Sequence, residues 1–399
     1  MTATSFDGTV EIEKLVYGGE GLARVDGQVM LVPYVLPGEK VRVGGERVNS
    51  GLMRGSLLSV LESSTQRVTP RCEYFASCGG CHYQHSDYAF QLQQKSNILR
   101  ETLLRLGGIR YEGEIPIISG EPWMYRNRIQ LHFAGSEAGF HKAGSRDLCD
   151  IHHCEISSPM LNQVILKLQD AVKQPEWPQF MRSLELFTNE EQVQFNIVDS
   201  ARPVAARFFE WCSSFIPFLA KGPIEYAAAA RVFRISRGSF FQVNRFLIDS
   251  LVAEVLREAR GNYAVDLYAG VGLFSLALSG RFQRVEAVER SRPAFRDLEW
   301  NIGQSGRAIQ GSAEEFLRNL SEAPDWIVAD PPRAGLGREA TDELHRIRPR
   351  RLTLVSCDPA TLTRDLKRLG GEYGIERLTL IDLFPQTYHF EVVAHLAKS

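Results

Sequence analysis

Residues 352–359 read Leu352-Thr353-Leu354-Val355-Ser356-Cys357-Asp358-Pro359. The first five residues have the character of a buried β-strand, and Pro359 prevents the strand from continuing past the cysteine. In an open parallel sheet, ligands and reacting groups gather where the chain leaves the carboxyl ends of the strands. The position of Cys357 therefore indicates a reacting group. The alternative is a small buried thiol, since unpaired cysteines are often buried.

Strand-like and helix-like segments alternate around this stretch, from about residue 226 to residue 399. Such alternation predicts an α/β fold with a doubly wound sheet. We expect its strands at 264–267, 285–288, 307–310, 325–329 and 352–356, with two closing runs at 378–383 and 390–396.

A glycine-containing turn, Tyr268-Ala269-Gly270-Val271-Gly272, follows the first of these strands. Its glycines allow the backbone to turn tightly and to approach a ligand ahead of a helix. Glu289 ends the next strand, about twenty residues on, where an acid commonly binds ribose hydroxyls. The sequence lacks a third glycine at the dinucleotide spacing. A nucleoside such as S-adenosylmethionine is therefore favoured over a nicotinamide cofactor.

Cysteines cluster upstream, in Cys72-x5-Cys78-Gly79-Gly80-Cys81. Three thiols on glycine turns indicate a metal site, and an iron–sulfur cluster takes four thiolates, one of which can be distant in sequence. Cys149 and Cys154 are the candidates for the fourth ligand. A structural zinc site is the alternative, and it could use the nearby histidines His82, His152 and His153.

Two further regions precede the α/β part. Residues 6–61 contain strand-like runs at 9–12, 29–32, 40–43 and 55–61 separated by glycine turns, which predicts a small β-barrel of the OB type. Residues 62–225 combine a helix over 86–106 with a hairpin over 181–198, which predicts a mixed α/β domain. We thus expect three domains, at 1–61, 62–225 and 226–399. Arg126 and Arg128, two apart in an extended segment, fit a phosphate contact and a solvated strand edge equally well.

The composition is that of a globular protein: 44% of the 399 residues are hydrophobic and 24% are charged. No apolar run approaches the ~18 residues of a membrane span, and residues 1–7 lack the regions of a signal peptide. We therefore expect a cytoplasmic protein without a membrane partner. The net charge of −2 means that any RNA contact must use local basic surface.

The chain resembles the RNA uracil-5 methyltransferases, which make 5-methyluridine. The resemblance covers nearly the whole length and is carried, with the cysteines, by four markers: residues 266–272, Asp330-Pro331-Pro332-Arg333, Ser356-Cys357-Asp358-Pro359 and His389-Phe390-Glu391. It implies S-adenosylmethionine as cofactor, Cys357 as the nucleophile that adds to uracil C6, and Glu391 as the base that removes the C5 proton. The family more commonly has His-Val-Glu at the last marker, and this chain keeps the acid.

The resemblance also implies two sets of ligands. A 4Fe–4S cluster would be bound by Cys72, Cys78, Cys81 and Cys154, with Cys149 a bystander. The cofactor site would include Gln242, Tyr268, Gly270, Leu273, Glu289, Ser312 and Asp330. This sequence departs from the family's more usual Asn at Leu273 and Ser312.

The N-terminal module resembles the TRAM domain, a module of RNA-modifying enzymes, in Tyr17-Gly18-Gly19-Glu20-Gly21-Leu22-Ala23 and in residues 32–39. The module resembles that of the ribosomal branch of the family. The expected substrate is therefore ribosomal RNA, with tRNA as the alternative. The protein is expected to be a monomer. Two other hypotheses are a non-catalytic RNA-binding iron–sulfur protein and a cytosine-5 RNA methyltransferase. Retention of Cys357, Asp330 and Glu391 argues against the former, and the cluster cysteines argue against the latter.

Overall fold

We describe the fold from a computed structural model, in which residues 5–49 and 51–399 are described. Residues 1–4, which begin the predicted 1–61 module and form part of the start that lacks signal-peptide character, lie outside the described residues, as does residue 50. The chain divides into two compact units: residues 1–99, 140–151 and 384–389 form the first, and residues 100–139, 152–383 and 390–399 form the second. The three predicted domain ranges stay a prediction. No helix in the described part of the chain is both long and apolar enough to cross a membrane.

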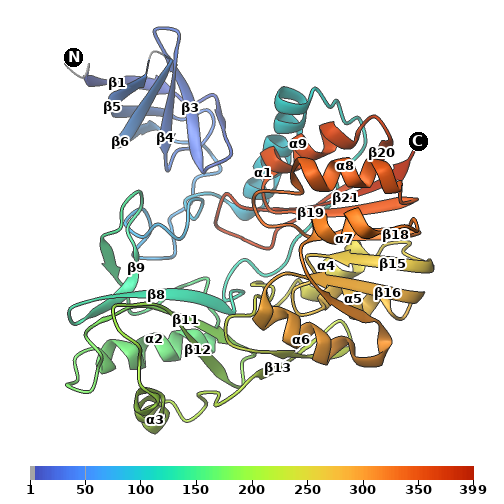
Figure 1. Ribbon diagram of the computed structural model, residues 1–399. Helices are drawn as coiled ribbons and strands as arrows, with labels where there is room; N and C mark the ends of the chain where they lie inside the picture. The colour runs from blue at the N-terminus through green and yellow to red at the C-terminus, as the bar shows by residue number, and fades with distance from the viewer. Residues whose placement is uncertain (1–4, 50) are drawn as a thin grey trace. The chain divides into compact units, whose positions relative to one another are not determined.

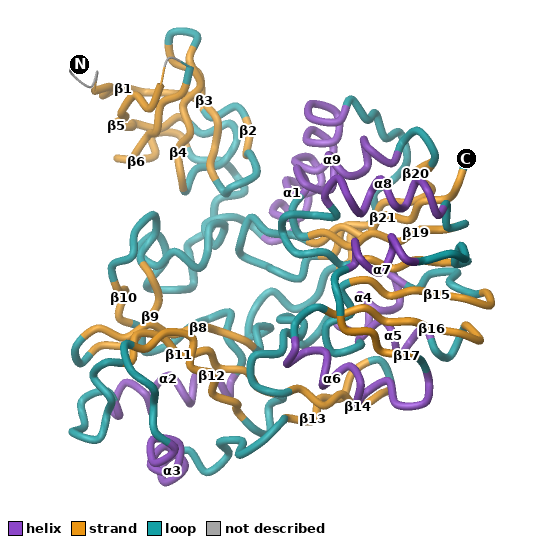
Figure 2. Tube along the Cα trace, viewed as in Figure 1, coloured by secondary structure: helices purple, strands orange, loops and turns teal. Residues whose placement is uncertain are grey.

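The first unit contains a six-stranded sheet. Its strands are β1 (Ser5–Glu11), β2 (Lys14–Leu15), β3 (Glu20–Val25), β4 (Gln28–Pro33), β5 (Lys40–Asn49) and β6 (Leu52–Glu62), in the order β1-β5-β6-β4-β3-β2 (Figures 1 and 2). Alternating residues pack into one core, with Ile12, Met30, Val32, Val41 and Val43 buried. The all-β prediction holds, but over residues 5–49 and 51–62 no ladder joins β1 to β2, so a closed barrel is not formed.

The sequence did not predict β3, because its glycine looked like part of a turn. Gly21 instead lies within the strand, where a Cβ atom would come 2.5 Å from Val35 Cγ2 and 2.8 Å from Ile12 Cγ2. A glycine is therefore needed for close packing at this position and not for chain reversal.

The first unit also holds the cysteine-rich loop 63–87, most of α1 (Tyr88–Thr102) and β10 (Leu148–Asp150). The helix predicted over 86–106 is present: α1 continues into a π-helical turn (Leu103–Gly107), which stops at Gly108 in a left-handed conformation with φ 68°.

The second unit begins with a sheet in which β9 (Glu137–His141), β8 (Arg128–Ala134), β11 (Met181–Thr188) and β12 (Val193–Ser200) are neighbours in that order. The predicted hairpin is the β11–β12 pair. The helices α2 (Pro159–Ala171) and α3 (Ala206–Phe215) accompany it. The sequence predicted strand–helix alternation from about residue 226. That start was wrong, because β13 (Ile224–Ala228) and β14 (Arg231–Ile235) form an antiparallel hairpin there, before the alternating strands and helices begin.

The main sheet of the second unit has eight strands. They are β15 (Gly261–Leu267), β16 (Phe282–Glu289), β17 (Arg307–Gln310), β18 (Trp326–Ala329), β19 (Arg351–Ser356), β20 (Tyr373–Ile381), β21 (Glu391–Lys398) and the short β7 (Ile117–Ile118). Their order is β17-β16-β15-β18-β19-β21-β20-β7. The first five in this order are parallel, and β21 runs antiparallel to both neighbours. The seven strands predicted from the sequence are all present.

Helices connect these strands. They are α4 (Ile248–Val255), α5 (Leu273–Leu278), α6 (Arg292–Ile302), α7 (Ala313–Asn319), α8 (Gly337–Ile347) and α9 (Pro359–Leu369) (Figure 1). Within this set α4 contacts α5 and α5 contacts α6, while α7 contacts α8 and α8 contacts α9. This grouping is that of a doubly wound sheet, whose ligand sites lie at the carboxyl ends of its parallel strands.

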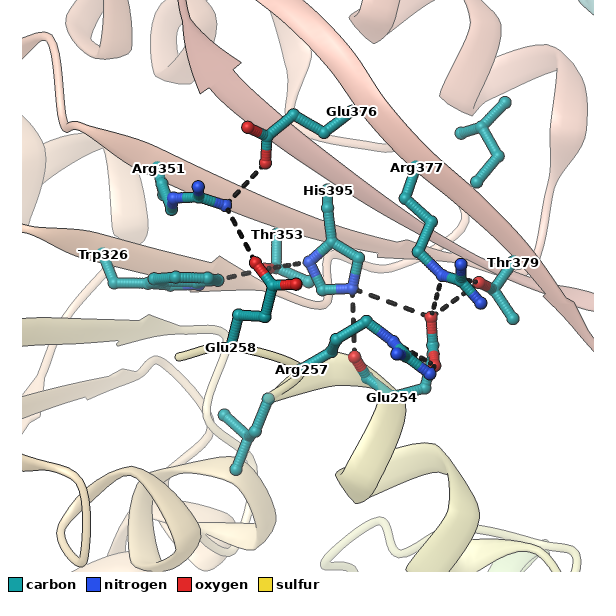
Figure 3. A network of polar contacts seen from close by, with 12 residues as sticks. Glu254, Arg257, Glu258, Trp326, Arg351, Thr353, Glu376, Arg377, Thr379 and His395 are labelled. Atoms are coloured by element: carbon teal, nitrogen blue, oxygen red, sulfur yellow. Dashed lines mark hydrogen bonds and ion pairs between the residues drawn. The ribbon is translucent and has the colours of Figure 1, made fainter. Parts of the chain in front are cut away.

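A buried polar chain ties α4 to the sheet (Figure 3). His395 on β21 lies within 3.0 Å of the Glu254 carbonyl through Nε2 and within 3.2 Å of the Thr353 hydroxyl through Nδ1. Trp326 Nε1 donates to the same hydroxyl at 3.0 Å. The Glu254 carboxylate accepts from Thr379 at 2.6 Å and from Arg377 at 2.9 Å. Every one of these buried polar groups has a partner, so the network fixes β18, β19, β20 and β21 to α4 without an unpaired charge.

Candidate active site at the carboxyl edge of the sheet

Three predicted residues of the reaction centre meet because of strand order and direction. Cys357 follows β19 and Asp330 follows β18, and these parallel neighbours end at the same edge. Glu391 is the first residue of β21, which is antiparallel to β19 and therefore begins where β19 ends. The last printed pair of that ladder, Ser356 with Val392, leaves Cys357 and Glu391 as the next residues on their strands.

Electrostatics show that these three side chains influence one another. Burial is the main cause that raises the pKa of Cys357 to about 11; the carboxylates of Glu391 and Asp330 act in the same direction, and Arg333 opposes them. Burial, together with the charge of Asp330, raises the pKa of Glu391 well above its usual value. Burial likewise raises the pKa of Asp330 to about 7. The cluster is therefore a partly buried thiol beside two carboxyl groups that hold protons more tightly than usual.

The loop that carries Asp330 and Arg333 is fixed to α9. The Thr361 hydroxyl donates to the Arg333 carbonyl at 3.0 Å, and the Leu336 N–H donates to the Asp365 carboxylate at 2.8 Å. Asp358, next to Cys357, caps the same helix by accepting from the Thr361 N–H at 2.8 Å. One helix thus holds both the Cys357 turn and the Asp330 loop. The roles of Thr361 and Asp365 could not be predicted from the sequence, because each depends on a contact distant in sequence.

The candidate cofactor residues lie along the same edge. Tyr268, Gly270 and Gly272 have φ values of 61°, 57° and 96° in the turn after β15, and Leu273 begins α5 as a buried residue. The positive φ of Tyr268 is uncommon for a residue with a side chain and marks a strained turn.

Glu289 closes the neighbouring strand and holds this turn. Its carboxylate accepts from the Gly270 N–H at 2.8 Å through one oxygen and from the Ser291 N–H at 2.6 Å through the other. Each carboxylate oxygen has two lone pairs, so both retain capacity for ligand hydroxyls.

Asp266, inside β15, is fully buried and accepts from the Ser275 hydroxyl at 2.5 Å. Burial raises its pKa to about 7, against the opposing effect of that hydrogen bond. Its other oxygen, Oδ1, has no hydrogen-bond partner among the described residues. It is a polar atom near the carboxyl end of β15 that no described residue satisfies.

The remaining two candidates approach from other loops. Ser312 caps α7 by accepting from the Glu315 N–H at 3.1 Å, and it lines a surface groove with Arg290, Gln310 and Glu314. Gln242 lies in the loop after β14, where its carbonyl accepts from the Asn127 amide at 3.1 Å. All the candidate cofactor and reaction-centre residues belong to the second unit.

The cysteine-rich loop supplies thiol donors in the first unit. The Gly80 N–H lies 3.4 Å from Cys78 Sγ, and Cys78 and Cys81 both contribute, after burial, to a raised pKa of Tyr34. Cys149 Sγ lies 3.8 Å from the Ser77 hydroxyl. Cys154 belongs to the second unit, where its N–H donates to the Asn162 side chain at 2.9 Å. The clustered thiols, with the N–H···S contact at Cys78, match the donor chemistry of an iron–sulfur cluster. Among residues 5–49 and 51–399, however, no three His, Cys, Asp or Glu side chains are grouped so as to hold a metal ion.

Two family models match the chain. The model described as tRNA (Uracil-5-)-methyltransferase matches residues 223–399, and the TRAM domain model matches residues 9–58. An uncharacterized RNA methyltransferase of Thermotoga maritima is 33% identical and covers 98% of each chain. A second, from Aquifex aeolicus, is 31% identical over 96% of this chain and 97% of its own.

A solved structure is also similar. The tRNA (uracil-54, C5)-methyltransferase of Pyrococcus abyssi, in complex with S-adenosyl-L-homocysteine, superimposes with a TM-score of 0.78 at 25% identity. The match covers 97% of this chain and 99% of that one.

Proposed function

Because the chain belongs to the RNA uracil-5 methyltransferases, we propose that it makes 5-methyluridine through a covalent bond between Cys357 and C6 of the target uracil. Its membership makes it an enzyme that methylates RNA with S-adenosylmethionine. The observation that carries the finer proposal is that β18 and β19 end just before Asp330 and Cys357, at the edge where β21 begins with Glu391.

The proposed reaction has two halves. The Cys357 thiolate adds to C6, and the π electron pair of the C5–C6 double bond shifts onto C5 and the C4 carbonyl oxygen, which gives an enolate that is nucleophilic at C5. The cofactor supplies an electrophilic methyl group on a sulfonium; C5 takes this methyl group, and S-adenosylhomocysteine is the leaving group. Glu391 then removes the C5 proton, the double bond re-forms, and the thiolate leaves. The raised pKa makes the ionised form of Glu391 a stronger base for this step, while it lowers the fraction of Glu391 that is ionised at a given pH.

The cofactor is proposed to bind along the edge from Glu289 to Asp330. Glu289 would accept hydrogen bonds from the ribose hydroxyls while still holding Gly270, and Asp330 would lie beside the reacting centre. The other proposed contacts are Gln242, Tyr268, Gly270, Leu273 and Ser312. The unsatisfied Oδ1 of Asp266 supports a polar ligand group nearby.

A 4Fe–4S cluster on Cys72, Cys78, Cys81 and Cys154 is proposed on the donor chemistry and the family resemblance, with structural zinc as its rival. Its role would be structural, since methyl transfer from a sulfonium to an enolate moves an electron pair and needs no redox step.

The RNA class has two candidates. The TRAM module was the reason to expect ribosomal RNA. However, the Pyrococcus abyssi tRNA enzyme matches over 99% of its length and 97% of this chain, so a similar whole-chain architecture occurs in an enzyme that acts on tRNA. The module alone therefore does not select ribosomal RNA, and tRNA is an equal candidate. The cytoplasmic location and the monomeric state remain predictions.

The test supplies methyl-labelled S-adenosylmethionine with unmodified ribosomal RNA and tRNA transcripts in parallel. Digestion to nucleosides should yield labelled 5-methyluridine from one class and none with Cys357→Ala. Labelled 5-methylcytidine would support the cytosine-5 alternative. Tight RNA binding with no transfer to either class would support the non-catalytic alternative.

A further inference from the structure

Helix α6 lies between two loops of the candidate site and holds both. The buried Asp297 carboxylate accepts from the Ser236 N–H at 2.7 Å, and from the hydroxyls of Ser236 and Ser239 at 2.6 Å each. These serines precede Gln242 in the same loop. The buried face of α6 therefore fixes the backbone that leads to a proposed cofactor contact.

Asn301, one turn further along α6, connects the helix to two more segments. Its side chain accepts from the Arg234 N–H at 2.8 Å and donates to the Arg234 carbonyl at 3.0 Å. It also donates to the Val271 carbonyl at 2.8 Å, inside the turn that contains Gly270. The side chain of Asn301 thus joins α6 to β14 and to the turn that contains Gly270.

The opposite face of α6 carries exposed side chains of a different chemistry. Arg292, Arg296 and Trp300 are spaced by four residues, so they lie along one side of the helix, and all three are exposed. Successive members are about 6 Å apart along the axis. We name these three residues, together with Arg234 on β14, the α6 stripe. It starts three residues beyond Glu289.

Trp300 is the unusual member of the α6 stripe, since 68% of its surface is exposed. The Arg234 guanidinium lies 4.7 Å from the centroid of its ring, and Arg234 Nε is 3.6 Å from the Asp297 carboxylate. Because Asn301 also fixes the Arg234 backbone, the cation is held against the indole by a rigid strand. Val232, on the same side of β14 as Arg234, is 60% exposed beside it. The indole is thus held in place but left open to a partner.

An exposed aromatic ring in line with arginines is the chemistry that binds single-stranded RNA. Bases stack on aromatic and guanidinium planes, and phosphates are neutralised by the arginines. The chain as a whole has a net charge of −2, so this concentration of arginine is local.

We propose that the α6 stripe binds an unpaired segment of the substrate RNA outside the reaction centre. One base stacks on Trp300, and the backbone passes Arg296 and Arg292 toward the cofactor edge of the sheet. This proposal rests on the proposed function only in taking RNA as the substrate. It is independent of which uridine is methylated and of the role of Cys357.

A binding measurement tests the stripe without the reaction. The probe is an oligoadenylate of about 12 nucleotides, a length within the site sizes of single-strand binders, which offers no uracil to the reaction centre. Trp300→Ala should weaken its binding roughly ten- to a hundredfold, and Trp300→Phe should restore most of the loss. Arg296→Gln should weaken binding and reduce its salt dependence by about one phosphate contact. Arg338→Gln on α8 removes another exposed arginine and should leave binding unchanged.

A second measurement uses the complete reaction on full-length RNA. Trp300→Ala should raise KM for the RNA with little change in kcat, and the affinity for S-adenosylhomocysteine should stay that of the parent protein. Unchanged oligoadenylate binding and unchanged KM in both Trp300→Ala and Arg296→Gln would refute the proposal. So would a Trp300→Ala protein whose sedimentation shows loss of a dimer with RNA affinity intact, because the surface would then serve self-association. If the parent protein binds oligoadenylate through Trp300 but makes no 5-methyluridine, the stripe stands and the proposed reaction fails.

Discussion

The N–H of Gly270 donates a 2.8 Å hydrogen bond to the carboxylate of Glu289, joining the turn after β15 to the end of the neighbouring strand β16. The acid therefore does two things at once: it shapes the glycine turn and presents its remaining lone pairs at the sheet edge. Loss of the acid therefore leaves the Gly270 N–H without its partner and also removes the proposed cofactor contact.

Glu289→Ala should weaken binding of S-adenosylhomocysteine by roughly ten- to a hundredfold, since losing a charged hydrogen bond costs about 1.5–3 kcal/mol. Calorimetric titration measures the affinity. Glu289→Gln keeps one acceptor oxygen for Gly270 and should lose less. Glu286→Gln, on the same strand but nearer its start, serves as the control. Parent-like affinity in a folded Glu289→Ala protein would remove Glu289 from the cofactor site.

The metal prediction concerns protein purified without oxygen. It should be brown and carry about four irons per chain, and Cys72→Ser, Cys78→Ser or Cys81→Ser should each reduce the iron content sharply. Cys149→Ser should retain it if Cys149 is a bystander as predicted. Elemental analysis decides between this outcome and about one zinc per chain, which would establish the structural-zinc alternative.

The raised pKa of Cys357 predicts how its reactivity changes with pH. With a pKa of about 11, the thiol is almost wholly protonated near neutral pH. As long as the pH stays below the pKa, each increase of one pH unit raises the thiolate fraction about tenfold. Alkylation of Cys357 by iodoacetamide, followed by mass spectrometry of its peptide, should therefore accelerate steadily from pH 7 to pH 9. Removing the negative group in Glu391→Gln should move this profile to lower pH. A plateau by pH 8 in the parent protein would contradict the raised pKa.

His395 gives a separate prediction for stability. Burial lowers its pKa, with Arg377 and Arg257 acting in the same direction and Glu254 opposing them. The folded state then keeps His395 neutral at a pH where the unfolded chain, with a pKa of about 6.5, already binds a proton. The unfolded state binds more protons, so stability is present above pH 6.5 and is lost as pH falls toward the lowered pKa. The slope of the unfolding free energy is at most about 1.4 kcal/mol per pH unit from one group.

Urea unfolding at pH 7.5, 6.5 and 5.5 tests this. The parent protein should lose more stability across the series than His395→Gln, because only the parent gains the proton on unfolding. An equal loss in both proteins would show that His395 does not contribute.

The network in Figure 3 also predicts that Thr353→Val destabilises the fold, since the substitution leaves Trp326 Nε1 and His395 Nδ1 without their shared hydrogen-bond partner.

How far the sequence could predict this molecule depends on whether a feature is local. The strand that ends at Cys357 and the turn at Gly270 were predictable, because a hydrophobic run followed by proline or glycine is a local signal. The insertion of β21 between β19 and β20 is not local, and that insertion brings Glu391 to the end of the Cys357 strand.

Arg128 shows the same limit for a side chain. From the sequence, Arg128 could have been a phosphate contact or part of a solvated strand edge. The structure shows neither. Arg128 is buried, pairs with Glu185 at 2.8 Å, donates to the Ser239 carbonyl at 2.8 Å and lies 4.5 Å from the Phe187 ring centroid. An arginine in a strand has no local signal for burial, because the carboxylate that permits it lies on another strand.

The last prediction separates Cys357 from Glu391 in time. Cys357→Ala should abolish methyl transfer, because no enolate forms and C5 never becomes nucleophilic. Glu391→Gln should still allow addition and methyl transfer, but the C5 proton would remain and the covalent enzyme–RNA adduct should accumulate. RNA containing 5-fluorouracil should imitate this with the parent enzyme, since fluorine cannot leave as a proton. A denaturing gel with labelled RNA and S-adenosylmethionine shows the adduct as a slow band that joins protein to RNA. If Cys357→Ala gives that band as strongly as the parent, Cys357 is not the nucleophile. If Glu391→Gln turns over at the parent rate, another group removes the proton, and the raised pKa of Glu391 reflects only its burial beside Asp330.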